Sequence, residues 1–311
     1  MEGTVRSPLR RGPSASSLLV RKVREVDREL AAAIPRVIKG GDDEAIHDMR
    51  VAIRRLRTLL KLARGVFGRF HADAVRAAFT AVHRATGTLR DEEVLDETLD
   101  EVTCDAPPFV AWKARRRARE RSLRRAVVAR LRAGDLTRAR HLLRALITLP
   151  VRPSRDRPAA KLARRAIDRA RRGVEQRRDA PTDDGVALHD LRIAYKELRY
   201  AAEILGDALP ADLAAMREPA SKFQKRLGEI HDADMAILAV KRARGLDEVT
   251  RALVLGSLDA LRAKRVGKYV AEMAPTASEP EIPGAPASET QMRAMRIKPS
   301  AASRSGKSPA S

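Results

Sequence analysis

Apolar residues recur at helical spacing along most of the chain, and no stretch shows the strict apolar–polar alternation of a half-buried strand. Pro35 is expected to end the first helix, and Gly40-Gly41 and Gly134 separate later ones. The predicted helices cover residues 18–34, 42–64, 72–99, 111–132, 136–149, 159–178, 186–205, 212–244 and 246–273. An all-α protein built from packed amphipathic helices follows from this pattern.

Prolines 150, 153 and 158 follow one another closely in the middle of the chain, which predicts a linker over residues 151–158. Helical regions are expected on either side of it, over 17–150 and 159–273. Residues 1–16 and 274–311 are rich in Pro, Ser, Ala and Arg and lack sustained apolar periodicity. Both ends are therefore predicted to be disordered.

Two sequence patterns occur twice, in the same order. The segment from His47 to Arg57 matches the one from His189 to Arg199 (189 − 47 = 142), and paired aspartates precede both copies. Downstream, the segment 87–91 matches 228–232 (228 − 87 = 141). Recurrence of both patterns at nearly one distance predicts a duplicated helical bundle.

The first repeated pattern separates charge from apolar surface. At about 100° per residue, its cations fall in a stripe roughly 80° wide, beside an apolar stripe of similar width. In the first copy the stripe consists of His47, Arg50, Arg54, Arg57 and Lys61; in the second it consists of His189, Arg192, Lys196 and Arg199. The apolar stripe is expected to face the core and the cationic stripe to emerge at its edge.

A basic stripe on one helix is ordinarily a solvated face. Solvated faces usually mix acids with bases, because opposite charges four residues apart stabilise a helix. No acid interrupts the first stripe, whereas the second departs at Glu203, where the first has Lys61. Clustered cations favour a bound polyanion that neutralises them.

Composition narrows the choice of polyanion. The 311 residues include 63 Lys and Arg against 41 Asp and Glu, a net charge of +22, but only 3% are aromatic. Proteins that hold single-stranded nucleic acid stack bases on aromatic rings. A polymer of phosphates needs no such rings. The single cysteine, Cys104, fits a reducing cytoplasm, and no apolar run approaches the ~20 residues of a membrane span. A soluble cytoplasmic protein is expected.

The two His-Asp-hydrophobic-Arg openings, the continuations at 54–57 and 196–200, and the segments 87–91 and 228–232 resemble the CHAD domain, the conserved histidine α-helical domain. The resemblance covers residues 18–272. It implies two tandem, pseudo-symmetric four-helix bundles with a basic cleft between them that binds inorganic polyphosphate, and association with polyphosphate granules. The chain is similar to the stand-alone type, because it lacks the Glu-x-Glu-x-Lys signature of a neighbouring triphosphatase domain. Neither catalysis nor a cofactor is therefore expected.

The resemblance also implies which side chains meet the polymer. Besides the two stripes, these are Arg84, Arg90, Lys222, Lys225, Arg226 and His231. Alanines replace Lys222 and Arg226 in the first copy, so its downstream helix is predicted to be the poorer phosphate site. Asp91 and Asp232 are expected to orient a His or Arg, and whether Arg90 faces the ligand or makes such a pair stays open. The histidines are expected to change charge near pH 6.5.

Two alternatives remain. Residues 113–132 are dense in Arg, with Glu120 as their one acid, and the basic tail could also attract DNA or RNA without sequence specificity. Three His-Asp dipeptides are compatible with a metal-dependent phosphohydrolase, but their Arg-rich surroundings disfavour a divalent cation, and no metal ligand is expected.

Overall fold

The structure is a computed structural model that describes residues 12–40, 42, 44–151 and 156–273. Its contacts group residues 1–271 into one compact unit and 272–311 into another, of which the described part is Glu272 and Met273. The disorder predicted for the two ends falls mostly on residues 1–11 and 274–311, which lie outside the described part. The first helix begins at Ala15, two residues before the predicted folded region.

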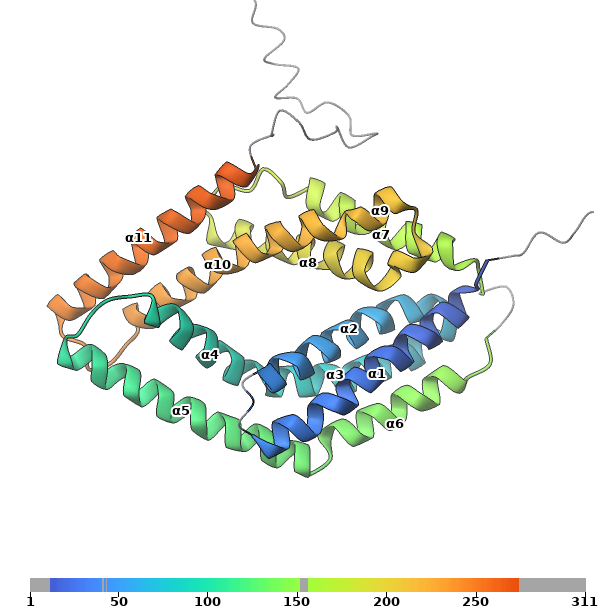
Figure 1. Cartoon of the computed structure of the whole chain (residues 1–311), viewed down its shortest axis with the longest axis horizontal. Coiled ribbons are helices and arrows are strands. Elements are labelled where there is room, and N and C mark those ends of the chain that lie inside the picture. Colours follow the sequence, from blue (N-terminus) through green and yellow to red (C-terminus); the bar gives the residue numbers. More distant parts are fainter. Residues whose placement is uncertain (1–11, 41, 43, 152–155, 274–311) are drawn as a thin grey trace, which may run out of the picture. The chain divides into compact units, whose positions relative to one another are not determined.

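The predicted all-α class is confirmed. Within the described residues there is no strand, apart from an isolated bridge between Ser14 and Pro158. The helices (Figure 1) are α1 (Ala15–Lys39), α2 (Glu44–Phe67), α3 (Arg69–Ala85), α4 (Gly87–Asp100), α5 (Pro107–Arg132), α6 (Asp135–Thr148), α7 (Ala159–Glu175), α8 (Gly185–Leu205), α9 (Ala211–Ala215), α10 (Arg217–Lys241) and α11 (Glu248–Met273), with a 3-10 turn at Gly206–Ala208.

Some helix ends differ from the predicted ones. Helix α1 passes through Pro35 and continues to Lys39. The proline removes one main-chain hydrogen bond, but Ala33 and Val37 remain buried on either side of it, and their packing holds the last turns together. The region predicted as helical over 72–99, with Gly87 inside it or at a break, is two helices that meet at Thr86. Asp184, one of the paired aspartates before the second repeat, caps α8 and accepts hydrogen bonds from the main chain of Val186 and Ala187.

The sequence repeat is visible in the helices. Helices α5 and α11 begin 141 positions apart (248 − 107 = 141) and end 141 positions apart (273 − 132 = 141). By the same offsets α2 corresponds to α8, and α10 spans the equivalents of the end of α3 and the whole of α4. Helix α6 has no counterpart among the described residues.

The largest hydrophobic core draws residues from both sides of the predicted linker. It combines the inner faces of α1, α2, α3 and α6 with Ala159 and Ala163 of α7 and Tyr200, Ile204 and Leu205 of α8. Main-chain hydrogen bonds join the same regions, from Ala15 N to the Arg157 carbonyl and from Ala159 N to the Pro13 carbonyl. Packing therefore does not divide the chain at residues 151–158.

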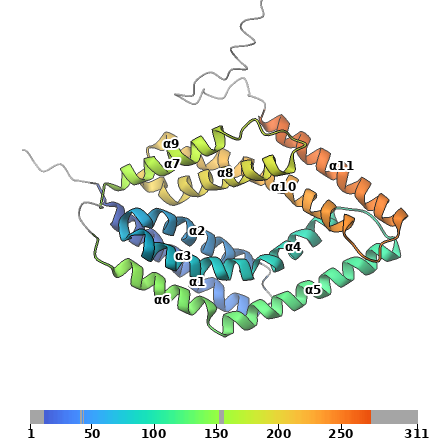
Figure 2. The same cartoon turned by 180° about the vertical axis from the view of Figure 1, so that it is seen from behind.

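A second core lies where α4, α5, α10 and α11 meet. It contains Phe109 and Trp112 of α5, Leu99 of α4, Val240 of α10 and Leu258 of α11. In Figures 1 and 2 the start of α5 lies next to the connection between α10 and α11. This core joins the ends of α4 and α10 to the first halves of α5 and α11.

The Arg-dense helix α5 is matched by acids on α4. Glu92 pairs with Arg116 (2.7 Å) and Arg119 (3.1 Å), and Glu93 pairs with Arg124 (3.1 Å). Further along, Arg117 pairs with Asp96 and Asp100, and Lys113 also pairs with Asp100. Much of the charge in residues 113–132 is thus neutralised within the protein, which the sequence of α5 alone did not indicate.

None of the described helices has the combined length and apolarity needed to cross a membrane.

Candidate polyanion-binding site

Cations from α2 and α8 line a shared cavity of about 430 Å³, called the cationic cavity below. Helices α2 and α8 are neighbours in both views of the molecule (Figures 1 and 2). The lining residues are Arg50, Arg54, Arg57, Thr58, Lys61 and Leu62 of α2, Arg76 and His83 of α3, Ala166, Arg169 and Ala170 of α7, and Arg192, Ile193, Lys196, Glu197, Tyr200 and Ala201 of α8. The two repeats therefore bring most of their stripes to one place.

The amphipathic pattern of each helix explains this placement. On α2 the apolar residues Ile46, Met49, Ile53, Leu56 and Leu60 are all fully buried. On α8 their equivalents Leu188, Leu191, Tyr195 and Leu198 are buried as well. The neighbouring stripe of each helix then lies at the edge of the core, where its charged ends can reach the cavity.

Burial and mutual repulsion weaken the protonated state of the cavity cations. Burial, reinforced by the positive charge of Arg54, lowers the pKa of Arg50 to about 10. Burial and the charges of Arg192 and Arg54 lower the pKa of Lys196 to about 8. The pKa values of Arg57 and Arg192 also fall, mainly through burial. A nearby anion would reverse each of these changes.

Several buried polar atoms in the cavity have no hydrogen-bond partner within the described protein. They are the Nε atoms of Arg54, Arg76 and Arg192, Nε2 of His83 and the hydroxyl of Tyr200. A buried donor left without an acceptor costs roughly 1–3 kcal/mol. The three guanidinium Nε–H groups and the Tyr200 hydroxyl can each donate, and such a group of donors is typical of a site whose acceptor is a ligand.

Acidic side chains are scarce around these donors. Among the described residues, no acid forms an ion pair with Arg54, Arg76, Arg169, Arg192 or Lys196. The acid in the lining is Glu197, which pairs with Lys61 across the cavity (2.9 Å). The cavity therefore has positive charge that the described protein does not neutralise.

Other cations of the stripes are fixed by the protein. Arg50 donates to the His83 carbonyl (3.1 Å) and to Oγ1 of Thr86 (2.6 Å), so it joins α2 to the junction of α3 and α4. Arg57 donates from Nε to Oγ1 of Thr80 (3.1 Å). These bonds hold the two guanidinium groups at the cavity before any ligand binds.

The two aspartates predicted to orient other side chains lie at equivalent places. The charge of Asp91 acts on Arg50 and that of Asp232 acts on Arg192, and each opposes the fall in arginine pKa that burial causes. Burial also raises the pKa of Asp232 itself. Their orienting role stays a prediction.

The histidines differ from the expected behaviour. His47 is exposed near the start of α2, outside the cavity lining. The rings of His189 and His231 lie 4.6 Å apart, and burial, followed by the charge of Arg192, lowers the pKa of His231 to about 4. Burial lowers the pKa of His189 too, and that of His83 to about 3. His83 and His231 are thus neutral at pH 6.5 and do not change charge there.

Other predicted ligand residues also lie outside the lining. Arg90 pairs with Glu93 (3.2 Å) and Glu97 (3.1 Å), so its place at the ligand stays a prediction. Arg199 stacks on the Tyr200 ring (4.1 Å from its centre) and pairs with Glu203 (2.9 Å). Of the rest, Arg226 pairs with Glu229, and Arg84, Lys222 and Lys225 are exposed.

The downstream helix of the first repeat, which was predicted to be the poorer phosphate site, is the one that reaches the cavity. Arg76 and His83 of α3, in the first half, line the cavity, whereas no residue of α10 does. Sequence reasoning also missed Arg169 of α7. A comparison of the repeats could have indicated Arg76, because another arginine, Arg217, stands at its equivalent position (217 − 76 = 141). Arg169 corresponds to an acid, Asp27 (169 − 27 = 142), so the repeat did not indicate a cation there.

No group of three His, Cys, Asp or Glu side chains within the described part of the chain is arranged to hold a metal ion.

Comparison with known proteins gives concordant matches. A model of the CHAD domain matches residues 23–241. Uncharacterised proteins from two strains of Mycobacterium tuberculosis (CDC 1551 / Oshkosh and ATCC 25618 / H37Rv) are each 29% identical over 214 residues, which is 64% of this chain. The chain spans only 40% of the length of these curated relatives.

Solved structures share the fold. The CHAD domain from the plant Ricinus communis is 24% identical with a TM-score of 0.67, over 87% of this chain and 96% of that one. PptA from Streptomyces chartreusis is 16% identical with a TM-score of 0.58, over 83% of this chain and 96% of that one.

Proposed function

The chain belongs to the CHAD domain family, and on that premise we propose that it binds inorganic polyphosphate in the cationic cavity without catalysing a reaction on the polymer. In the cell it would associate with polyphosphate granules. Storage, scaffolding and regulation of another protein are all compatible with such binding.

One observation carries the proposal: unpaired cations from both halves of the repeat converge on one cavity whose buried N–H groups have no acceptor within the described protein. Arginine binds phosphate in two places through its planar fork, and a polymer of phosphates offers such oxygens at every unit. A simple anion would neutralise one part of the cavity, whereas a polymer can reach Arg54, Arg192 and Arg169 together.

The charge of the described surface favours this cavity over α5 as the place where a polyanion binds. The cations of α5 lie opposite the acids of α4, and several of them form ion pairs there. Nucleic acid would have to bind without the aromatic rings that stack bases. It is therefore the competing ligand against which the proposal is tested.

The decisive variant removes two cavity charges that are not fixed by other residues. Arg54→Gln combined with Arg192→Gln removes two guanidinium groups whose Nε atoms have no partner, and leaves in place Arg50, which holds α2 to Thr86. Charge-assisted hydrogen bonds contribute roughly 1.5–3 kcal/mol each, so we expect affinity for long-chain polyphosphate to fall by about 100-fold or more.

The matched control is Arg121→Gln combined with Arg125→Gln, which removes the same net charge from exposed positions of α5. Its affinity should fall only a few-fold, and circular dichroism should show equal helicity in both double variants. Equal losses in the two would mean that net charge, and not this cavity, governs binding.

Two further measurements separate the alternatives. In a competition titration at physiological salt, polyphosphate should displace duplex DNA and single-stranded RNA, and the reverse order would favour the nucleic-acid function. Incubation of polyphosphate with the protein and Mg²⁺ should leave the chain length and free phosphate unchanged. Release of phosphate would instead show an enzyme.

A further inference from the structure

Two ion pairs join α2 to α8, and the sequence repeat relates one to the other. Arg55 of α2 pairs with Glu203 of α8, and Lys61 of α2 pairs with Glu197 of α8 (2.9 Å). By the offset of the repeat, Glu197 is the equivalent of Arg55 (197 − 55 = 142) and Glu203 that of Lys61 (203 − 61 = 142). The same contact therefore occurs twice, with both cations on α2 and both acids on α8.

The pair of Arg55 and Glu203 is fixed by its surroundings. Its side chains are 28% and 10% exposed. Arg55 also pairs with Glu29 (2.8 Å), and Glu203 also pairs with Arg199 (2.9 Å). Neither Arg55 nor Glu203 lines the cationic cavity.

The pair of Lys61 and Glu197 is exposed and lies in the cavity lining. Its side chains are 45% and 52% exposed, and neither forms a further hydrogen bond or ion pair with a described residue. An ion pair this exposed contributes little to stability, because water solvates each charge when the two separate. The pair can therefore open without disturbing the helices that carry it.

Glu197 changes the electrostatics of the cavity. Its charge raises the pKa of Lys196, whereas the charges of Arg192 and Arg54 lower it. In the free protein the carboxylate thus offsets part of the crowded positive charge. Beside a bound phosphate the same carboxylate would repel the ligand, since like charges oppose one another most strongly where water is partly excluded.

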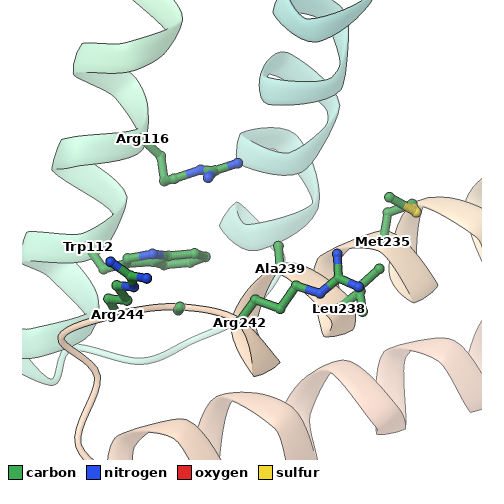
Figure 3. Close-up of a pocket in the computed structure, with 8 residues that line it drawn as sticks. Trp112, Arg116, Met235, Leu238, Ala239, Arg242 and Arg244 are labelled. Atoms are coloured by element: carbon green, nitrogen blue, oxygen red, sulfur yellow. The ribbon is translucent and has the colours of Figure 1, made fainter.

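A pocket between α5 and α10 shows that positive charge alone does not require an acid in the lining. This pocket, of about 330 Å³, has Arg116, Arg242 and Arg244 among its described lining residues and no acid. Figure 3 shows Arg244 beside Trp112 and Arg242 beside Leu238, so these cations lie apart. An acid in the lining thus accompanies the crowded cations of the cationic cavity.

We propose that Glu197 is an internal competitor of the polymer: it holds Lys61 while the cavity is empty and releases it when a phosphate of the chain arrives. This inference rests on the proposed function. Lys61 lies seven residues after Arg54 on the same face of α2, about 10 Å along the helix axis, so a polymer bound at Arg54 meets Lys61 with a later unit of its chain. Whenever that unit leaves, Glu197 recaptures Lys61, which shortens the lifetime of the complex.

Glu197→Gln removes the competing charge and keeps the size of the side chain. Long-chain polyphosphate should bind this variant about threefold to tenfold more tightly at moderate salt, mainly through slower dissociation, as measured by stopped-flow displacement. The matched control is Asp190→Asn, which removes the same charge from an exposed position of α8 outside the cavity lining. Its affinity should stay within about twofold of the parent.

A double-mutant cycle separates competition for Lys61 from simple repulsion. When Lys61→Gln is already present, Glu197 has no cation to hold there, so adding Glu197→Gln should improve affinity by less than about twofold. Equal gains with and without Lys61 would overturn the proposal, because Glu197 would then act only through its own charge. An unchanged dissociation rate in Glu197→Gln, or an equal gain in Asp190→Asn, would overturn it as well.

Thermal unfolding tests whether the exposed pair is structural. Glu203→Gln, in the fixed pair, should lower the unfolding midpoint, whereas Glu197→Gln should lower it much less. Equal losses would show that both pairs hold the fold and would contradict the role of competitor.

The proposed function fails separately. If Arg54→Gln with Arg192→Gln binds polyphosphate as tightly as the parent, the cationic cavity is not the site. If that double variant loses binding while Glu197→Gln has no effect, the cavity remains the site and only the competitor is removed.

Discussion

Lys196 shows how the surroundings of one side chain set the chemistry of the cationic cavity. It comes from α8, and its pKa is lowered to about 8 by burial and by the charges of Arg192, Arg54 and Arg57. Below that pH the ammonium group is charged and can meet a phosphate; above it the amine is neutral. The cavity therefore loses one positive charge within a moderately alkaline range.

Polyphosphate affinity should accordingly fall as pH rises from 7 to 9, by up to roughly tenfold, since one unit of pKa corresponds to about 1.4 kcal/mol. Binding titrations at constant ionic strength measure this directly. Lys196→Arg keeps its charge over the same range and should give a flatter profile. Identical profiles would remove Lys196 from the contact with the polymer.

The same change in pKa affects folding with the opposite sign. The unfolded chain keeps the Lys196 proton up to its ordinary pKa of 10.5, whereas the folded chain releases it near 8. The free protein therefore gains stability from this group as pH rises from about 8 towards 10.5, because the unfolded state then binds more protons than the folded state.

Most cavity residues on α2 could be predicted from the sequence, because helical spacing alone puts Arg50, Arg54, Arg57 and Lys61 on one face. The contributions of Arg76 and Arg169 could not be predicted in that way. Each is a cation on a helix whose distance from α2 is set by packing between helices far apart in sequence. His83 carried no signal at all, since it lies outside both repeated patterns.

At the scale of helices, ion pairs join α4 to α5, two of the helices that form the second core. Glu92 is 5% exposed and lies between Arg116 and Arg119. Removing one member of a buried ion pair leaves the charge of its partner without a counter-charge and shielded from water, which destabilises the folded state. The two arginines are partly exposed (29% and 59%), so the effect is smaller than for a fully buried pair.

Glu92→Gln should lower the free energy of unfolding by roughly 1–3 kcal/mol, measured by urea unfolding with Trp112 fluorescence and circular dichroism. The control is Glu97→Gln on the same helix, which also loses an ion pair with arginine but at a site 64% exposed. Its effect should stay below about 1 kcal/mol. Equal effects in the two variants would mean that burial of Glu92 contributes nothing.

Element boundaries show where local sequence is insufficient. The helical regions and their faces follow from periodicity, but the passage of α1 through Pro35 and the breaks between α3 and α4 and between α9 and α10 could not be placed by periodicity alone. The helix over 107–132 contains one acid, Glu120, so its own sequence indicated an exposed basic surface. The partners that neutralise it come from α4, and only the folded chain brings them together.

At the scale of the whole molecule, the excess of 63 basic over 41 acidic residues acts unevenly. Several cations on α5 are paired with acids, whereas most of those in the cationic cavity have no acidic partner among the described residues and repel one another. The predicted division at 151–158 coincides with the sequence repeat, yet one core includes residues from both sides of it. The repulsion between the cavity cations tends to separate α2 from α8, and the largest hydrophobic core, which contains residues of both helices, holds them together.

Salt should act on the free protein and on the complex with opposite signs. Raising sodium chloride from low to moderate concentration screens the repulsion between Arg54, Arg192 and Lys196, so the midpoint of thermal unfolding should rise by a few degrees without ligand. Polyphosphate affinity should fall steeply over the same range. Binding releases counterions from the polymer, and their release into a more concentrated salt solution gains less free energy.

Thermal melts and binding titrations across one salt series test both effects. Arg54→Gln with Arg192→Gln should show a smaller rise in the unfolding midpoint than Arg121→Gln with Arg125→Gln, since only the former relieves the crowded cations. A midpoint that falls with salt in the parent protein would show that its ion pairs outweigh the repulsion.

The crowding of cations in the cavity also bears on the lifetime of the protein in a cell. Proteases degrade a chain in proportion to how often it opens, and a ligand that binds only the folded state reduces that frequency. On the proposed function, scarce polyphosphate leaves the repulsion uncompensated and turnover is fast, whereas abundant polyphosphate slows it. The abundance of this protein would then follow the supply of its ligand, with the cavity itself as the sensor.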